Sequence, residues 1–336
     1  MPFRINTREA HAGSTASTVY VLADDTGTAR IEVWPAFGFN CVRWAVEAGN
    51  VFHTAPDWET NPLPTRSGHP ILFPFPNRLK AGRFTFDGIE YQLPLNESSG
   101  RHAIHGFTPK LPWRVVGTET GKDYAAITGE FQLGVDQPTL ADAWPSDFSI
   151  FVTYKLRGNS LEVIALVRNV GEKRMPFGLG YHPYFCLPSV PNAAVDEFQV
   201  YVPAKKLWLA DESLATGQSE IPPADVDFFK AKAVGPTALD HLYGSLKPQG
   251  RTVALLSHPA ANEQIRVEAD HTFRELLLFT PPHRRALAIE PYTCTTDALN
   301  FAPQGIDAGL RVLEPGKEFA AVVRYTVEAK GATFAD

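Results

Sequence analysis

The chain has 336 residues, 44% of them hydrophobic and 20% charged, which is the composition of a globular protein with a full core. Its net charge of −6 argues against nucleic acid or an anionic membrane as a partner. The three cysteines, Cys41, Cys186 and Cys294, are too widely spaced to suggest a disulfide framework or a zinc site. The start lacks the apolar core of a signal peptide, and no apolar run approaches the ~20 residues of a membrane span. We therefore expect a cytoplasmic protein.

Strand signals, either short apolar runs or alternation of apolar and polar residues, dominate the chain from end to end. In chain order they cover residues 19–22, 29–34, 41–46, 83–86, 89–93, 113–119, 124–133, 149–157, 160–168, 199–202, 252–256, 264–268, 275–279 and 318–328. Asp87 and Gly88 between two of these runs predict a tight hairpin, because both tolerate the positive φ angles of a two-residue turn. Gly158 and Asn159 predict a second hairpin with longer arms.

Helical patterns are few. Residues 222–230 predict one or two turns, and residues 296–301 predict a short helix. Strands at short spacing with turn residues between them favour an all-β sandwich or barrel. Because no linker, charge run or internal repeat interrupts the pattern, we expect one large β domain covering residues 1–336.

A buried strand is predicted over residues 286–289, and it delivers Glu290 at its end. Pro291 is expected to end the strand, because proline has no N–H to give to the ladder. Burial at this place would raise the pKa of the Glu290 carboxyl, so that it could serve as a base near neutral pH. The alternative is that Glu290 is a partly solvated strand end.

Two further stretches contain polar side chains in unusual settings. Residues 70–78 hold three prolines, which impose an extended path that presents Asn77 and Arg78 at its end. The arginine fork suits a carboxylate or vicinal hydroxyls. Residues 101–107 place His102 and His105 three apart, but a third ligand at suitable spacing is missing, so we predict no metal site.

A histidine and an aspartate stand out in the second half of the chain. His182 lies in an aromatic stretch, residues 176–185, whose glycines and proline are typical of a pocket lip rather than of a strand interior. Histidine can take or give a proton near pH 7. Asp240 lies in residues 239–244, which by themselves predict a turn.

Taken in order, these stretches resemble the signatures of the aldose 1-epimerases, the galactose mutarotases. The resemblance covers the chain from about Gly68 to Asn300, and the Leu-Glu-Pro-Gly at 313–316 also fits. It implies a large antiparallel β-sandwich of the galactose mutarotase-like supersandwich type, in agreement with the strand pattern. The matching motifs are Phe-Pro-Phe-Pro-Asn-Arg at 73–78, Ala-Ile-His-Gly at 103–106, Gly-Tyr-His-Pro-Tyr-Phe at 180–185, Leu-Asp-His at 239–241, Glu-Pro-Tyr at 290–292 and Asp-Ala-Leu-Asn at 297–300.

By position, the resemblance implies that Glu290 is the catalytic base and His182 the catalytic acid. Residues expected to bind the sugar are Arg78, His105, Asp240 and Asn77. The implied reaction interconverts the α and β anomers of an aldohexose such as galactose or glucose by ring opening. It needs no cofactor or metal, and its partner is a small monosaccharide; we expect a monomer or a homodimer.

The mechanism requires that His182 starts protonated although its aromatic setting would lower its pKa. We therefore expect a nearby carboxylate, Asp240 or Glu290, to offset that effect. An aromatic side chain, Phe279 or Tyr181, is expected to stack on the apolar face of the sugar.

Three other functions remain open from the sequence. A glycoside hydrolase would use Asp240 and Glu290 as paired carboxylates. A sugar-binding or sensing protein on the same scaffold would bind without turnover. A cysteine nucleophile, Cys186 or Cys294, would lie four residues after a site residue, where a small core residue is the simpler interpretation.

Overall fold

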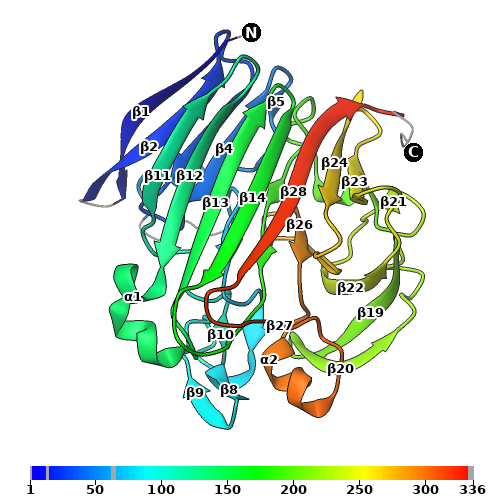
Figure 1. The fold of residues 1–336 in the computed structure, drawn as a ribbon. Coiled ribbons are helices and arrows are strands. Elements are labelled where there is room, and N and C mark those ends of the chain that lie inside the picture. The colour runs from blue at the N-terminus through cyan, green and yellow to red at the C-terminus, as the bar shows by residue number, and fades with distance from the viewer. Residues whose placement is uncertain (1, 13–14, 62–65, 332–336) are drawn as a thin grey trace.

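The computed structural model describes residues 2–12, 15–61 and 66–331. Strands dominate it and all their named pairings are antiparallel, so the all-β prediction is confirmed (Figure 1). In the described part of the chain no helix is long and apolar enough to cross a membrane. The helical segments are α1 (Leu133–Asp136), α2 (Ala298–Phe301) and the 3-10 turns Lys80–Gly82, Pro138–Ala143, Val195–Glu197 and Ala302–Gln304.

The largest sheet has nine strands and forms the layer nearest the viewer in Figure 1. Its long central strands bury alternate residues, as the period-two pattern predicts. In spatial order the strands are β11 (Arg114–Thr120), β12 (Ala125–Gln132), β13 (Phe148–Arg157), β14 (Ser160–Asn169), β28 (Glu318–Ala329), β24 (Glu263–Ala269), β23 (Thr252–Ser257), β18 (Gln199–Tyr201) and β21 (Lys232–Ala233).

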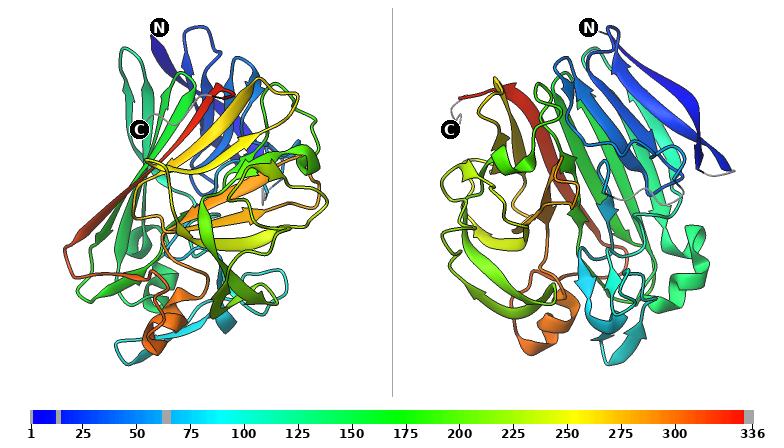
Figure 2. Two further views of the ribbon diagram at one scale, coloured as in Figure 1. Left: turned by 90° about the vertical axis from the view of Figure 1, so that its right-hand side faces the viewer. Right: turned by 180° about the vertical axis from the view of Figure 1, so that it is seen from behind.

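An eight-stranded sheet packs behind part of the first one, and the view turned by 90° in Figure 2 shows the two layers edge-on. In this sheet β17 pairs with β26 beside the main path. The strands are β20 (Leu214–Glu220), β19 (Ala204–Asp211), β22 (Asp240–Leu246), β25 (Glu275–Phe279), β26 (Leu287–Tyr292), β16 (Gly180–Tyr181), β6 (Ile71–Leu72) and β17 (Tyr184–Phe185).

A five-stranded N-terminal sheet covers the rest of the large sheet, and the rear view in Figure 2 shows it in blue in front of the green strands. Its strands are β1 (Phe3–Ala12), β2 (Thr15–Asp24), β3 (Arg30–Trp34), β4 (Asn40–Val46) and β5 (Gly49–Asn50). Three small ladders complete the fold: β7 (Arg78–Leu79) with β10 (Ala103–Ile104), β8 (Arg83–Phe86) with β9 (Ile89–Gln92), and β15 (Met175–Phe177) with β27 (Arg311–Leu313).

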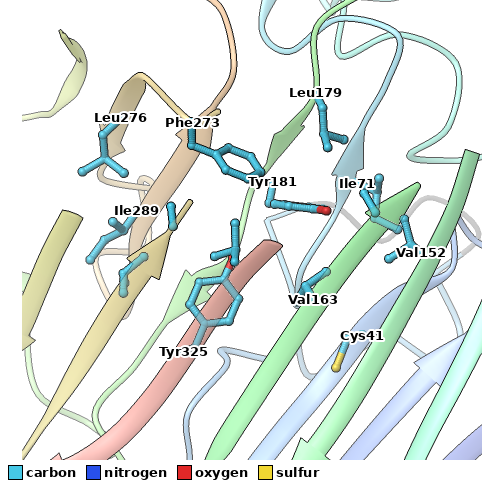
Figure 3. Close-up of a cluster of buried hydrophobic side chains, with 14 of the residues drawn as sticks. Cys41, Ile71, Val152, Val163, Leu179, Tyr181, Phe273, Leu276, Ile289 and Tyr325 are labelled. Carbon is cyan, nitrogen blue, oxygen red and sulfur yellow. The ribbon is translucent and has the colours of Figure 1, made fainter. Parts of the chain in front are cut away.

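One main core fills the space between the layers and contains buried side chains from Leu22 to Val327. Figure 3 shows Tyr181 and Ile289 of the eight-stranded sheet in the same core as Tyr325 of β28, which belongs to the nine-stranded sheet. The residues directly before and after Ile289 on β26 therefore face away from this core, because side chains along a strand point to opposite faces in turn. The outer face of the eight-stranded sheet is the surface on which the candidate site lies.

Both predicted hairpins are confirmed. Phe86 pairs with Ile89 across Asp87 and Gly88, whose φ angles of 48° and 79° are those of a type I′ turn. β13 and β14 pair over ten positions around the second turn. The short helix at 296–301 corresponds to α2.

Three local predictions are wrong. Residues 222–230 form no helix, because their carbonyl groups bond elsewhere: Phe228 accepts from the Val202 N–H, and Val226 accepts from the Tyr243 hydroxyl. Residues 240–246 form strand β22 instead of a turn, since the neighbouring strands supply its ladder. β26 does not end at Pro291, because Tyr292 still pairs on both sides.

Candidate active site

The strand register of the eight-stranded sheet places the candidate site residues side by side on its outer face. Glu290 lies on β26 directly opposite Leu277 of β25. Because side chains alternate along each strand, the residues two positions away from these two share their face. The adjacent row runs across four strands through Asp240, Phe279, Ala288 and Tyr184.

A cavity of about 170 Å³ opens on this face. All six residues predicted for the site line it: Asn77, Arg78, His105, His182, Asp240 and Glu290. The remaining lining residues are Arg66, Ile104, Tyr184, Leu277, Phe279 and Tyr292. The cavity is smaller than a site for a drug-sized molecule, which takes about 300 Å³ or more, and suits a ligand of roughly one sugar ring.

Glu290 lies at the floor of the cavity with 0% of its surface exposed, so it is not the partly solvated strand end considered above. The Tyr292 hydroxyl donates a hydrogen bond of 2.5 Å to its Oε2. Its Oε1 lies 3.2 Å from Nε2 of His182 but has no aligned hydrogen-bond donor among the described residues. Burial raises the pKa of the Glu290 carboxyl well above its usual range, and the Tyr292 hydrogen bond opposes that rise.

His182 follows β16, and its Nε2 also lies 3.2 Å from the Tyr184 hydroxyl. The two rings stack with centroids 4.5 Å apart. Burial lowers the pKa of His182 well below its usual range, and the neighbouring His105 adds to this effect. The pKa of Glu290 is thus raised and that of His182 lowered, because burial favours the neutral form of each group.

His105 is held as a neutral hydrogen-bond donor. The Asn77 N–H donates to its Nδ1 at 3.2 Å, so the proton of the neutral ring is on Nε2. Burial lowers the pKa of His105 to about 3, and the nearby Arg78 contributes. The following glycine is required: Gly106 has φ 70°, and a Cβ there would come 2.1 Å from the carbonyl oxygen of Phe73.

Arg78 is oriented by a carboxylate that the sequence motifs do not contain. Its Nε donates to Oε1 of Glu97 at 2.5 Å, and its Nη1 contacts Oδ1 of Asn77 at 3.3 Å. Asp240 lies further off, with Oδ2 3.9 Å from Nη1 of Arg78. Burial raises the pKa of Asp240, and the Arg78 charge opposes that rise. The Nε of the guanidinium is thus bound by Glu97, and Arg78 lines the cavity.

The sequence interpretation does not identify four polar residues that line or support the cavity: Arg66, Glu97, Tyr184 and Tyr292. Two of them carried a usable signal. Tyr184 and Tyr292 each follow a predicted catalytic residue by two positions, and for Tyr292, which shares β26 with Glu290, that spacing places the two side chains on one face. Glu97 belongs to a loop and meets Arg78 only through the tertiary fold.

Several candidates lie outside the cavity. Tyr181 is fully buried in the main core, so its predicted stacking role is wrong, whereas Phe279 does line the cavity. Cys186 and Cys294 are buried away from the lining residues, and burial raises the pKa of each thiol to about 12. His102 accepts a hydrogen bond from the Ala81 N–H. Within residues 2–12, 15–61 and 66–331, no three His, Cys, Asp or Glu side chains are grouped as metal ligands.

A carboxylate and an imidazole at the floor of a small polar cavity, on the outer face of a large antiparallel β-sandwich, form the kind of site that acid–base enzymes use. Comparison with known families agrees. The family model described as "Aldose 1-epimerase" matches residues 50–326. The chain therefore belongs to the aldose 1-epimerase family, and the prediction of an isomerase is confirmed.

Individual relatives are distant. The chain is 28% identical to the uncharacterized protein YihR of Escherichia coli (strain K12), over 74% of this chain and 75% of that protein. It is 29% identical to the galactose mutarotase of Rattus norvegicus over 41% of this chain and 37% of that protein. The crystal structure of a galactose mutarotase-like protein from Clostridium acetobutylicum matches with a TM-score of 0.85 at 22% identity, over 97% of this chain and 99% of that one. This last likeness confirms the predicted fold.

Proposed function

We propose that the protein is a mutarotase that interconverts the α and β anomers of an aldose, with Glu290 and His182 as its proton-transfer groups. The observation that carries this proposal is the 3.2 Å separation between Glu290 Oε1 and His182 Nε2 at the floor of the cavity. A sugar that inserts its anomeric carbon there has a carboxylate and an imidazole within reach of the two oxygens on that carbon.

The proposed reaction is two coupled proton transfers. Ionised Glu290 removes the proton of the anomeric hydroxyl, and the C1–O bond to the ring oxygen breaks as C1 becomes a carbonyl. Protonated His182 gives its proton to the departing ring oxygen. Rotation about C1–C2 presents the other face of the carbonyl, and ring closure returns both protons to their original groups.

The proposed reaction uses ionised Glu290 and protonated His182, although burial by itself favours the neutral form of each group. A general acid and a general base work best when proton transfer is nearly balanced, and each is worth roughly 10²–10⁴-fold in rate. An ionised Glu290 beside His182 would stabilise the imidazolium. Arg78, His105, Asp240 and Asn77 would hold the ring hydroxyls, and Phe279 would pack against an apolar face of the ring.

Two alternatives are less well supported. A glycosidase needs a second carboxylate as its catalytic partner, yet the group nearest to Glu290 Oε1 is the imidazole of His182. A binding protein without turnover would not need a buried carboxylate whose pKa is raised, although it could retain one. The aldohexose identity, the cytoplasmic location, the single domain over residues 1–336 and the monomeric or dimeric state stay predictions.

The test is the optical rotation of freshly dissolved α-D-glucose and α-D-galactose, followed with the wild type and with Glu290→Gln. We expect the wild type to speed the approach to equilibrium and the variant to lose roughly 10²–10⁴-fold of that enhancement. A matched control is Glu318→Gln, which changes an exposed carboxylate paired with Arg168 on the other sheet.

The outcomes separate the alternatives. A wild type that binds sugar without changing the rate at which rotation decays would replace the proposal with the binding protein. Release of reducing sugar from an aryl glycoside would replace it with the hydrolase. Equal activity of wild type and Glu290→Gln would remove Glu290 from its role as the base.

A further inference from the structure

The wall of the cavity is unevenly charged. On one side the charge of Arg78 is balanced by Glu97 and faces Asp240. On another side Arg66 lines the cavity, is exposed, and forms no ion pair with a carboxylate of the described chain. Most arginines of the described chain do form such a pair, so a lone arginine at the mouth of a sugar-sized cavity needs an explanation.

Arg66 lines the cavity and belongs to a group of four basic residues, the cationic rim: Arg66, Arg285, His53 and His283. The rings of His53 and His283 stack with centroids 4.5 Å apart. Burial lowers the pKa of each of these histidines, and the charge of Arg285 lowers both further. Arg66 acts on His283 in the same direction, so the four groups lie within electrostatic reach of one another.

A backbone hydrogen bond joins the cationic rim to β17, the strand that pairs with β26. The backbone N–H of His53 donates to the carbonyl of Tyr184 at 2.7 Å, and Tyr184 lines the cavity beside His182. Arg66 is also close enough to Tyr184 to lower the pKa of its hydroxyl, against the dominant effect of burial. The cationic rim is therefore adjacent to the cavity wall at Tyr184.

The neighbouring Arg284 provides a contrast within the same turn. Its guanidinium donates hydrogen bonds to Oδ1 of Asp196 at 2.8 Å and to the carbonyl of Gly235 at 2.7 Å. Arg285, the next residue, is exposed and has no carboxylate partner in the described ranges. The lowered pKa values leave both histidines neutral near pH 7, so Arg66 and Arg285 carry the positive charge of the cationic rim, and a bound anion would accept charge-assisted hydrogen bonds from them.

We propose that the aldose turned over by this site carries an anionic group, a phosphate ester or a carboxylate, which Arg66 and the other residues of the cationic rim bind while the reacting end of the sugar lies against Glu290 and His182. This inference rests on the proposed mutarotase function and narrows its substrate class. Two arginines without carboxylate partners and two imidazole rings supply the donors that such a group needs. Neutral hexoses would then be poorer substrates.

The experiment measures anomer exchange at equilibrium by two-dimensional NMR exchange spectroscopy, with glucose, glucose 6-phosphate and glucuronate as substrates. We expect the wild type to have a higher kcat/KM for at least one anionic sugar than for glucose, and the two anionic arms distinguish phosphate from carboxylate. Arg66→Gln should lower the ratio of anionic to neutral kcat/KM by about ten- to a hundredfold, the usual worth of a charged hydrogen-bonded contact. Added salt should lower the anionic rate and leave the neutral one unchanged.

Arg251→Gln is the matched control, because Arg251 is an exposed arginine outside this cavity, and it should leave the ratio unchanged. A wild type that prefers glucose to both anionic sugars, or an unchanged ratio in Arg66→Gln, would overturn the inference while the mutarotase function stands. If no sugar is turned over, the mutarotase function fails instead. Calorimetric binding of the same three sugars then decides this inference, and equal affinities would overturn it.

Discussion

Tyr292 and Glu290 lie two residues apart on β26, and the Tyr292 hydroxyl donates a 2.5 Å hydrogen bond to Oε2 of Glu290. The bond engages the carboxylate oxygen that faces Tyr292 and leaves Oε1 toward His182 and the cavity. It also stabilises the ionised carboxylate against the cost of complete burial. Tyr292 is thus a positioning residue that controls how readily Glu290 ionises.

Replacing Tyr292 with phenylalanine removes this donor and keeps the ring. The pKa of Glu290 then rises further, because burial is no longer opposed. Since the base must be ionised, the acidic limb of the profile of kcat/KM against pH should move to higher pH. At pH 7 we expect kcat/KM to fall about tenfold or more, the worth of a hydrogen bond to a charged group, with recovery at alkaline pH.

Tyr243→Phe is the control for this change. Tyr243 is buried on the same sheet and its hydroxyl donates to the carbonyl of Val226, away from the cavity. This variant should lose some stability and keep the wild-type pH profile. Coincident profiles of Tyr292→Phe and the wild type would show that the hydrogen bond does not tune the base.

Six of the residues that line the cavity could be predicted because they occur in short motifs with distinctive chemistry. Glu290 after an apolar strand and His182 in an aromatic stretch were both recognisable, and the structure brings them within 3.2 Å. Their supporting groups were not recognisable from sequence. Glu97 is an ordinary loop glutamate until the fold places it 2.5 Å from Arg78, and nothing in the residues near Arg66 indicates the two histidines that lie beside it.

The local errors share one physical cause. Asp240 was assigned to a turn on local composition, but β19 and β25 on either side supply hydrogen bonds that make its segment a strand. The predicted helix at 222–230 fails for the same reason, because its carbonyl groups accept hydrogen bonds from distant donors such as Tyr243. Long-range pairing outweighed local propensity in both places.

Arg78→Lys tests whether the guanidinium fork, rather than its charge, holds the sugar. Lysine keeps the charge but cannot contact Glu97, Asn77 and the ligand at once. We expect KM to rise about ten- to a hundredfold, with a smaller change in kcat, because contacts to remote hydroxyls act on ground state and transition state alike.

Glu97→Gln separates positioning from direct binding. Glutamine can still accept a hydrogen bond from Arg78 but loses the ion pair, so we expect a KM between those of the wild type and Arg78→Lys. If Arg78→Lys lowers kcat alone and leaves KM unchanged, Arg78 acts on the chemistry instead of on sugar binding. The measurement is initial-rate polarimetry over a range of sugar concentrations.

His69 predicts how stability depends on pH. It is fully buried between the hydroxyls of Tyr154, at 3.1 Å, and Tyr325, at 2.9 Å, and burial lowers its pKa to about 3. Between pH 6.5 and 3, His69 in the unfolded chain, with an ordinary histidine pKa near 6.5, binds a proton, whereas His69 in the folded state does not. His69 therefore lowers the free energy of unfolding as pH falls from about 6.5 toward 3, by about 1.4 kcal/mol per pH unit.

His69→Phe should change this dependence in a defined way. At pH 7 the variant loses both ring hydrogen bonds and leaves the buried Tyr325 hydroxyl unsatisfied, at a cost of about 1–3 kcal/mol, whereas the Tyr154 hydroxyl keeps its 3.3 Å contact with the backbone carbonyl of residue 69. Between pH 6 and pH 4 its stability should fall less steeply than that of the wild type, because one proton fewer is taken up on unfolding. Urea unfolding at each pH measures both effects, with the exposed His271→Asn as a control. Parallel curves for His69→Phe and wild type would mean that His69 already binds its proton in the folded state.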